Sequence, residues 1–399
     1  MEGASGAVTH PEGFLAAGVR AGIKERGEDI ALIFSERPAS AAGVFTTNIV
    51  QAAPVVLSRA RLPRETCRAV VVNSGNANAC TGEQGMRDAR TMAAEAARLL
   101  GISEDDILVA STGIIGRPLP MDKVRAGIGQ AVRSLSRDGG TGAARAIMTT
   151  DTRPKEASVE VSLGRSKAKI SGMAKGAGMI CPSLATMLAF ITTDAAVRPE
   201  ILQACLSRSA ETSFNCLTVD GDSSTNDAVV VLANGAAAND VIDSEGPDLS
   251  AFQEALDVVT ASLARQIARD GEGATKLIEI TVRGAESFQD ARRIAKAVAN
   301  SPLVKTAMFG CDPNWGRILA AAGGVGVRFE PKAVSLFLGR LALLHRGEPV
   351  DFSQEEAHEL LRKPEVGVLL EVGPGPASAT VWTCDFSYDY VRINAEYHT

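Results

Sequence analysis

The chain of 399 residues lacks several features that mark common classes of protein. Aromatic residues make up only 4% of it, with three tyrosines and two tryptophans, so its core must be mainly aliphatic. Basic residues (41) are fewer than acidic ones (47), and the net charge of −6 argues against nucleic acid as the main partner, because phosphate binding needs a basic face. No apolar run is long enough to cross a bilayer, so no transmembrane helix is predicted.

Metal chemistry has little support in the sequence. The seven cysteines are odd in number and form no Cys-x-x-Cys pair, which argues against a zinc site or a disulfide framework. The four histidines are scattered. Residues 220–227 resemble a calcium loop, but Thr225 stands where that loop needs glycine and Val231 where it needs glutamate. We therefore predict no metal and no bound cofactor, and an anchoring loop near the active site at 220–227.

Fingerprints of other enzyme classes are also missing. Residues 73–78 lack the glycine spacing of a dinucleotide-binding or phosphate-binding loop, and no Gly-x-Ser-x-Gly elbow is present. The first residues carry neither the basic segment nor the apolar stretch of a secretion signal. We therefore expect a cytoplasmic protein with reduced cysteines.

Strand and helix patterns alternate along the chain, which predicts a mixed α/β fold. A turn-rich loop is expected at 73–78 and a turn at 111–113, and residues 250–253 resemble a capping box. Beyond residue 300 the pattern favours strand and loop, so we place a domain boundary near 290, between domains 1–290 and 291–399. The predicted strands are 67–73, 107–110, 159–162, 168–171, 228–232 and 277–282, and the predicted helices are 83–100, 121–135, 199–212, 250 to just before 270, and 290–298.

One glycine-rich junction is the most informative feature that the sequence contains. Lys175-Gly-Ala-Gly-Met leads through Pro182 to Ala185-Thr186, and an apolar run to Ile191 follows at once. If the bond before Thr186 is cut, this residue carries nucleophile and base together, because its freed α-amine, with a pKa of roughly 7.7–8.0, accepts the hydroxyl proton near neutral pH. The same pattern also describes any loop that enters a core strand.

Five further motifs accompany this junction. They are Ser111-Thr-Gly-Ile-Ile-Gly116, Met148-Thr-Thr-Asp-Thr152, Asp270-Gly-Glu-Gly-Ala-Thr-Lys276, Gly310-Cys-Asp-Pro-Asn-Trp-Gly-Arg317 and Tyr390-Val-Arg-Ile-Asn-Ala-Glu-Tyr-His-Thr399. In this order, and over essentially the whole chain, they resemble the ornithine acetyltransferase family of the cyclic arginine pathway. One departure is Cys181-Pro-Ser-Leu184, where that family more often has His or Ala followed by Pro-Asn-Met. The Ala-Thr pair and the Lys-Gly loop on which the cleavage depends are retained.

The resemblance implies a layered fold of the N-terminal-nucleophile type, with sheets between helices and two domains. It implies self-cleavage between Ala185 and Thr186 into an alpha chain, 1–185, and a beta chain, 186–399. Thr186 is then the nucleophile, and Thr112 and Gly113 stabilise the oxyanion. The substrate-binding residues that the resemblance implies are Thr149, Lys175, Thr186, Glu272, Asn394 and Thr399, and the assignment to Thr149 competes with the adjacent Thr150.

The residue types suit these roles. A glycine lets a backbone N–H approach a developing O⁻, and a threonine hydroxyl donates a second bond. Lys175 can pair with a substrate carboxylate, and Glu272 can hold a substrate amine. Taken alone, a lysine or glutamate is more often a solvated surface charge. Cys181 is the one thiol close in sequence to the predicted nucleophile.

The sequence leaves three functions to compare. The main interpretation is an acyltransferase that moves acetyl from N2-acetylornithine to glutamate, with acetyl-CoA as an additional donor in some members of the family. The alternative is a self-cleaving aminopeptidase or amidohydrolase, which uses water as acceptor. A third is an uncut metabolite-binding protein. The acyltransferase interpretation implies small-molecule substrates, alpha and beta chains assembled as a heterotetramer or larger, and no nucleic-acid or membrane partner.

Overall fold

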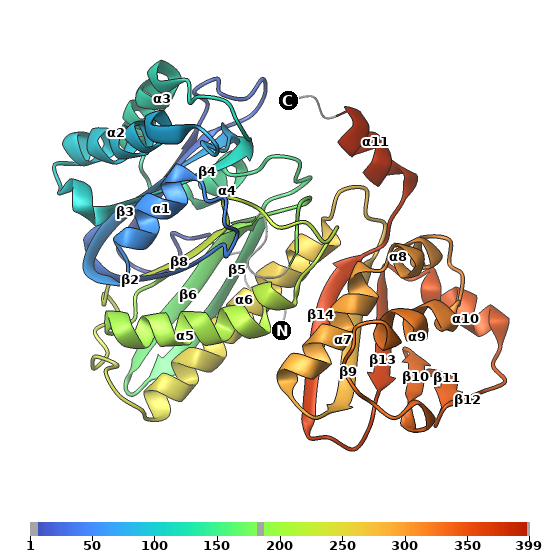
Figure 1. Cartoon of the computed structure of the whole chain (residues 1–399). Helices are drawn as coiled ribbons and strands as arrows, with labels where there is room; N and C mark the ends of the chain where they lie inside the picture. The colour runs from blue at the N-terminus through green and yellow to red at the C-terminus, as the bar shows by residue number, and fades with distance from the viewer. Residues whose placement is uncertain (1–6, 182–186, 397–399) are drawn as a thin grey trace. The chain divides into compact units, whose positions relative to one another are not determined.

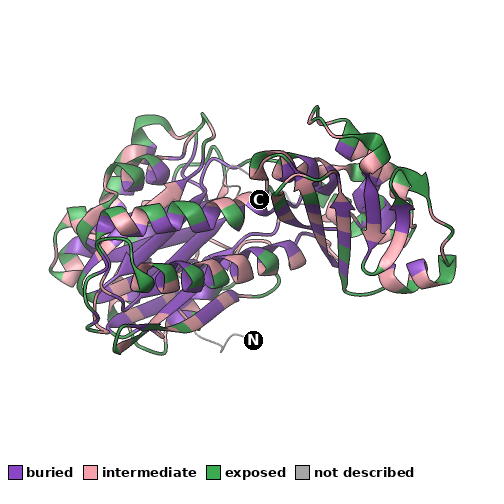
Figure 2. Ribbon diagram, turned by 90° about the horizontal axis from the view of Figure 1, so that it is seen from below, coloured by how far each residue is buried: buried purple, intermediate pink, exposed green. Residues whose placement is uncertain are grey.

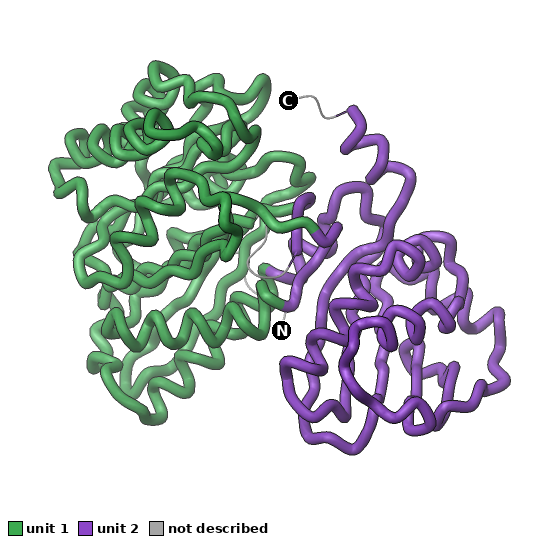
Figure 3. Tube along the Cα trace, viewed as in Figure 1, with its two compact units in different colours: residues 1–176, 183–215, 222–263 green, residues 177–182, 216–221, 264–399 purple. Residues whose placement is uncertain are grey.

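The computed structural model describes residues 7–181 and 187–396. Packing divides the chain into two compact units (Figure 3). Unit 1 comprises Met1–Gly176, Ser183–Asn215 and Asp222–Leu263, and unit 2 comprises Ala177–Pro182, Cys216–Gly221 and Ala264–Thr399. The predicted domain boundary at 290 stays a prediction, although strand β9 (Leu277–Ala285), which precedes it, lies in the sheet of unit 2. The mixed α/β class is confirmed in both units.

Unit 1 is built on a sheet of eight strands among the described residues (Figure 1). The strand order is β4-β3-β2-β8-β7-β6-β5, and β1 pairs with β2. The pairs β3–β4 and β7–β8 are parallel, and β5 and β6 form the predicted hairpin. The strands are β1 Phe14–Val19, β2 Ile30–Phe45, β3 Arg64–Asn76, β4 Ile107–Ile114, β5 Lys155–Leu163, β6 Ser166–Lys175, β7 Leu188–Thr193 and β8 Ala228–Ala233.

Helices cover both faces of this sheet, and its strands are buried between them (Figure 2). Side chains alternate across β3: Val71 packs in a core cluster with α2 and α3, whereas Val70 and Val72 pack in the cluster that includes α4. The helices at 83–100, 121–135 and 199–212 are confirmed to within two residues at each end. The helices of this part are α1 Ala53–Ala60, α2 Gly82–Leu100, α3 Met121–Arg133, α4 Gly140–Ala146, α5 Pro199–Thr212, α6 Pro247–Arg269 (its residues from 264 on belong to unit 2) and the short 3₁₀ helices η1 Glu104–Asp106 and η2 Phe214–Cys216.

Two predicted turns and one predicted cap are wrong. Residues 111–113 lie within β4, because its parallel pairing with β3 continues as far as Gly75 and Gly113, and β3 itself runs on to Asn76. Ser250 lies inside α6, which begins at Pro247, and its Oγ donates to the carbonyl of Gly246 at 3.3 Å. Tertiary pairing and an earlier helix start override these local signals.

Unit 2 contains a six-stranded sheet among the described residues, in the order β12-β11-β10-β13-β9-β14. Helix α7 packs on β9 and β14 through a stripe of buried side chains that includes Ile294 and Val298. The strands and loops expected beyond residue 300 are present, with five strands there, but four α-helices and one 3₁₀ helix that the sequence did not predict also follow within the described residues. The elements are β9 Leu277–Ala285, α7 Phe288–Asn300, α8 Pro302–Phe309, α9 Trp315–Gly323, η3 Pro331–Ala333, β10 Ser335–Leu338, β11 Leu341–His345, β12 Glu348–Pro349, α10 Gln354–Leu361, β13 Glu365–Glu371, β14 Ala377–Cys384 and α11 Tyr388–Glu396.

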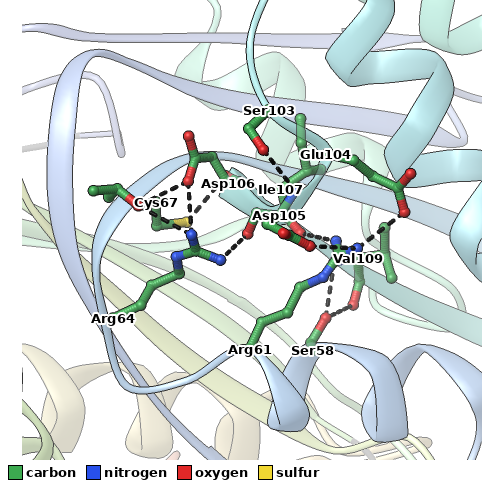
Figure 4. Close-up of polar contacts among 11 residues, drawn as sticks. Ser58, Arg61, Arg64, Cys67, Ser103, Glu104, Asp105, Asp106, Ile107 and Val109 are labelled. Atoms are coloured by element: carbon green, nitrogen blue, oxygen red, sulfur yellow. Dashed lines mark hydrogen bonds and ion pairs between the residues drawn. The ribbon is translucent and has the colours of Figure 1, made fainter.

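Strand β4 carries Thr112 and Gly113; its first half is tied to α1, and the residue just before it, Asp106 of η1, is tied to the start of β3 (Figure 4). Ser58 bridges the β4 backbone at Val109, accepting from its N–H at 2.9 Å and donating to its carbonyl at 2.7 Å. The guanidinium of Arg64 pairs with Asp106 at 2.9 Å. These contacts fix the strand that positions the predicted oxyanion residues. No helix in the described parts of the chain is long and apolar enough to cross a membrane.

Candidate functional site

The predicted oxyanion residues lie at the carboxyl end of β4, beside the parallel strand β3. Gly113 is paired with Gly75 in the strand register. Its φ of 132° is one that residues with a side chain rarely adopt, and a Cβ placed there would lie 2.3 Å from the carbonyl carbon of Gly75. Only glycine therefore fits, and the neighbouring Thr112 is 2% exposed.

Lys175 ends strand β6 and contacts Thr112. Its side chain is 2% exposed, which excludes the interpretation as a solvated surface charge. The Nζ atom donates to Thr112 Oγ1 at 3.3 Å. Because a threonine hydroxyl accepts and donates at once, Thr112 keeps its own proton for a further acceptor. Two of the residues that the sequence predicts for different roles thus meet in unit 1, although they are 63 positions apart.

Asp151 organises the charges around Lys175. Its Oδ1 accepts from the fully buried Lys155 Nζ at 2.6 Å and from the N–H of Gly176 at 2.7 Å, and its Oδ2 accepts from the N–H of Thr149 at 3.0 Å. Burial by itself raises the pKa of this carboxyl, but the ammonium groups of Lys175 and Lys155 outweigh burial and hold the pKa well below its ordinary range. Asp151 is therefore ionised at neutral pH.

A second buried carboxyl, Asp227, has the opposite electrostatics. Its Oδ1 accepts from the N–H of Met187 at 3.0 Å, whereas the buried Oδ2 has no hydrogen-bond partner among the described residues. Burial raises the pKa of Asp227 well above its ordinary value, against smaller lowering effects from the Met187 N–H and from Lys175. Met187 directly follows Thr186 in the sequence. Asp227, whose raised pKa favours the protonated form, therefore accepts a hydrogen bond from the backbone one residue after the predicted cut.

The predicted anchoring loop at 220–227 contributes one more link within unit 1. Asn226 is buried, and its Nδ2 donates to the carbonyls of Ala77 and Ser111 at 2.6 and 2.8 Å. Ser111 in turn donates to Asn73 Oδ1 at 2.6 Å. This network fixes the backbone just before Thr112. Asn226 and the two aspartates lie within or next to motifs visible in the sequence, but nothing there marked them as site residues.

In unit 2, two predicted substrate-binding residues are in contact. Glu272 lies in the loop after α6 and is 8% exposed. Its Oε2 accepts from Asn394 Nδ2, on α11, at 2.8 Å. The sequence predicted both residues from the resemblance alone, and the structure brings them together across 122 positions.

The thiol of Cys181 lies in unit 2 and is half-buried. Burial raises its pKa, with partial opposition from Lys296 and Asn300. The thiol therefore stays protonated at neutral pH, and a protonated thiol is a poor nucleophile. Within 7–181 and 187–396, no group of three or more His, Cys, Asp or Glu side chains is placed to hold a metal ion.

The remaining predicted residues, Ala185, Thr186 and Thr399, lie outside the described residues. The nearest described strand is β7, whose first residue, Leu188, is paired with Lys175 in the antiparallel register with β6. The strand that follows the predicted nucleophile thus pairs with the residue that contacts Thr112.

Together these features define an α/β protein with a buried, lysine-rich polar cluster where β4 and β6 end. Comparison with known proteins agrees with the α/β class and also identifies the family. The pattern of the ArgJ family matches residues 15–399. The "Arginine biosynthesis bifunctional protein ArgJ" of Symbiobacterium thermophilum is 54% identical over 402 residues, covering 100% of both chains. The protein of the same name from Caldanaerobacter subterraneus subsp. tengcongensis is 48% identical over 403 residues, again covering 100% of both.

Among solved structures, that of the Arginine biosynthesis bifunctional protein argJ from Bacillus halodurans is 45% identical with a TM-score of 0.50. The match covers 52% of this chain and 97% of that one. The chain belongs to the ArgJ family, which confirms the resemblance inferred from its motifs.

Proposed function

We propose that this chain is an acetyltransferase that moves an acetyl group from N2-acetylornithine to glutamate through an ester on Thr186. The observation that carries the proposal is the buried contact between Lys175 and Thr112 in unit 1. It places a cation and a hydroxyl donor beside a position that only glycine can occupy, Gly113. Such preorganised donors stabilise the negative charge that develops on the oxygen during acyl transfer.

The chemistry follows from these groups. Thr186 Oγ attacks the acetyl carbonyl carbon while the freed α-amine takes the hydroxyl proton. The C–N bond to ornithine then breaks, the same proton passes to the leaving amine, and the acetyl group stays on Thr186. The amine of glutamate attacks this ester, and N-acetylglutamate leaves as the threonine oxygen regains its proton. Thr112 and Gly113 hold the oxyanion in both halves.

Self-cleavage before Thr186 has support beyond the motif. The Bacillus halodurans chain aligns over 97% of its own length with only 52% of this chain, so it is about half as long. That is the size of one product of a cut near the middle. A denaturing gel tests the cut directly: we expect two pieces, 1–185 and 186–399, and one intact band for Thr186→Ala.

The substrate contacts belong to the same proposal. We propose that Lys175 and Thr149 bind the amino-acid part of a substrate, and that Glu272 and Asn394 bind a substrate amine. The hydrogen bond between Glu272 and Asn394 supports this pairing, since it fixes a carboxylate that is almost fully buried. Thr399 completes the set through the resemblance.

Transfer and hydrolysis are separable by experiment. With acetylornithine alone, we expect the 186–399 piece to gain the mass of one acetyl group, and glutamate to remove it. An aminopeptidase or amidohydrolase would instead release acetate or product at the same rate with or without glutamate. Membership of the ArgJ family favours transfer. Absence of an acetylated 186–399 piece would contradict the proposal.

The oxyanion role gives a specific prediction. Thr112→Ala is expected to lower kcat by about 10²–10³, the usual effect of losing one oxyanion donor, with little change in KM. Thr112→Ser keeps the hydroxyl and is the matched control, expected within about tenfold of wild type. Equal losses in the two variants would assign Thr112 to packing.

Three finer properties complete the proposal. The relatives are named bifunctional proteins, which favours glutamate acetylation from acetyl-CoA as a second activity, measurable by release of the CoA thiol. We also propose a heterotetramer of two alpha and two beta chains, to be tested by light scattering on the purified protein. We also propose a location in the cytoplasm, which cell fractionation can test.

A further inference from the structure

The segment just upstream of the proposed cut is held by a carboxylate that the sequence did not single out. Asp220 accepts two backbone hydrogen bonds from this segment, from the N–H of Met179 at 2.6 Å and from that of Ile180 at 2.8 Å. The Ile180 carbonyl accepts in return from the N–H of Val219 at 2.8 Å. Both the N–H groups and a carbonyl of residues 179–180 are therefore hydrogen-bonded to the segment 216–221 of unit 2.

The hydrogen-bonded segment contains an unfavourable backbone conformation at Met179. Met179 has φ of 56°, in the left-handed region, which is unfavourable for a residue with a side chain and free of strain for glycine. Met179 is 40% exposed, whereas the hydrogen bonds that hold this conformation are made by its own N–H and by that of Ile180. The two N–H groups that Asp220 binds are those that such a conformation turns toward one acceptor, as in anion-binding turns.

The carboxylate is itself anchored within unit 2. Thr218 donates its N–H to the carbonyl of Trp382 on β14 at 3.0 Å, which ties the segment 216–221 to the sheet. The hydroxyl of Tyr390, on α11, donates to Asp220 Oδ2 at 3.3 Å. The Tyr390 ring stacks on Phe386 with centroids 4.6 Å apart. Asp220 thus links the loop to the C-terminal helix.

The neighbouring residues of the loop are fixed by the proposed substrate residue Glu272. The N–H of Glu272 donates to the carbonyl of Ala177 at 2.9 Å. A Cβ at Gly178 would lie 2.4 Å from the carboxyl carbon of Glu272, so only glycine lets the two approach. Residues 177–180 are consequently held between two carboxylates, and α11 bonds both of them through Tyr390 and Asn394.

We propose that Asp220 is a positioning residue for self-cleavage: it fixes the loop 177–181 in the strained conformation that presents the following segment for the cut before Thr186. This inference rests on the proposed function, because it assumes that the chain is cut there. It goes beyond that function by assigning the processing geometry to Asp220, which bonds the backbone of Met179 and Ile180 and the hydroxyl of Tyr390.

We call the hydrogen bonds from Met179 and Ile180 to Asp220 the clamp. The central test removes the clamp by mutating Asp220 and then relieves the backbone strain at Met179. Full-length chains are synthesised in a cell-free system, and the appearance of the 1–185 and 186–399 pieces is followed on denaturing gels. Asp220→Ala should slow cleavage about tenfold or more, since it removes two hydrogen bonds to a charged acceptor. Adding Met179→Gly to Asp220→Ala should bring the rate back to within about threefold of wild type, because glycine adopts the left-handed conformation without strain.

The controls separate this inference from the proposed function. Asp222→Asn, an exposed carboxylate two residues along the chain, should cleave at the wild-type rate. Wild-type chain that never cleaves overturns the proposed function and the clamp with it. Wild-type chain that cleaves while Asp220→Ala keeps its rate overturns the clamp alone. A double variant as slow as Asp220→Ala also overturns it, since the role then does not lie in the conformation of Met179.

The tie to α11 has its own matched pair. Tyr390→Phe removes the hydroxyl that bonds Asp220 and should slow cleavage about threefold, less than Asp220→Ala, because one long hydrogen bond of 3.3 Å to the carboxylate is lost and the two backbone bonds remain. Tyr388→Phe, on the same helix with its side chain 85% exposed, should leave the rate unchanged. Equal rates in both variants would limit the clamp to Asp220 itself and contradict the link to the C-terminal helix.

Discussion

Two aspartates bind the glycine-rich loop by the same chemistry, in two different settings. Asp151, in unit 1, accepts from the N–H of Gly176, and Asp220, in unit 2, accepts from those of Met179 and Ile180. Asp151 is buried with the fully buried Lys155, whereas Asp220 is half-buried. The first carboxylate therefore neutralises buried charge, and the second mainly sets a backbone conformation.

Both carboxylates accept hydrogen bonds from backbone N–H groups of the loop, but the free-energy cost of removing them should differ. Removing a carboxylate from a buried ion pair leaves the partner ammonium without compensation in a poorly solvated place. Removing Asp220 should cost less, because water can replace the carboxylate at the exposed N–H of Met179. We therefore expect Asp151 to govern the stability of the fold, and Asp220 to govern the processing of the chain with little effect on stability.

The largest expected effect is that of Asp151→Ala, which should lower the free energy of unfolding by about 3–5 kcal/mol, as for other broken buried pairs. Urea denaturation followed by circular dichroism measures it. Adding Lys155→Met should recover at least half of the loss, because it removes the stranded charge. A loss below about 1 kcal/mol in the single variant would show that water reaches Lys155 and would erase the contrast with Asp220.

Acid should produce the same loss in the wild type. The pKa of Asp151 is lowered in the folded state, so its contribution is complete above the ordinary value of 3.8 and disappears as the pH falls below it. We expect the unfolding free energy of wild type to decline more steeply than that of Asp151→Asn below pH 3.8. Parallel curves would mean that the lysines do not stabilise this carboxylate.

Asp227→Asn should act in the opposite direction and more weakly. The pKa of Asp227 is raised in the folded state, so ionisation opposes folding, and stability declines as the pH rises above 3.8 through the folded-state value. Asparagine keeps an acceptor for Met187 and has no proton to lose. The variant should be more stable than wild type at neutral pH, and the gain should vanish at acid pH. Thermal unfolding at both pH values measures it.

The smallest expected effect is that of Asp220→Asn on stability, about 1 kcal/mol or less, because the side chain is half-buried and its hydrogen bond from the Met179 N–H is exposed. The measurement is the same urea titration, made on chains that also carry Thr186→Ala so that cleavage does not interfere. A loss of unfolding free energy as large as that of Asp151→Ala would show that Asp220, like Asp151, mainly stabilises the fold.

Much of the fold was predictable from the sequence because its signals are local. The apolar residues of 83–100 and 199–212 recur at helical spacing, and α2 and α5 occupy those positions. The turn at 111–113 was mispredicted because Thr112 and Gly113 look like loop residues, whereas pairing with β3 keeps them in a strand. Long-range pairing of this kind leaves no local trace.

The candidate site was predictable only in part. Thr112, Gly113, Lys175, Glu272 and Asn394 were identified through the motifs that resemble the family. Asp151, Asp220 and Asp227 were missed as site residues because an aspartate in a motif or loop usually faces water, and only burial and partner distances reveal otherwise.

By itself, the sequence determined where helices and strands form, which residues recur in the family's order, and that the chain is ArgJ-like from residue 15 to its end. Tertiary structure alone decided which charges are buried and paired. The reason is that electrostatic energy depends on distances between atoms: Lys175 and Thr112 meet across 63 positions, and Tyr390 and Asp220 across 170. The separation of two residues along the chain does not determine the distance between their atoms, which is set when the sheets bring the residues together.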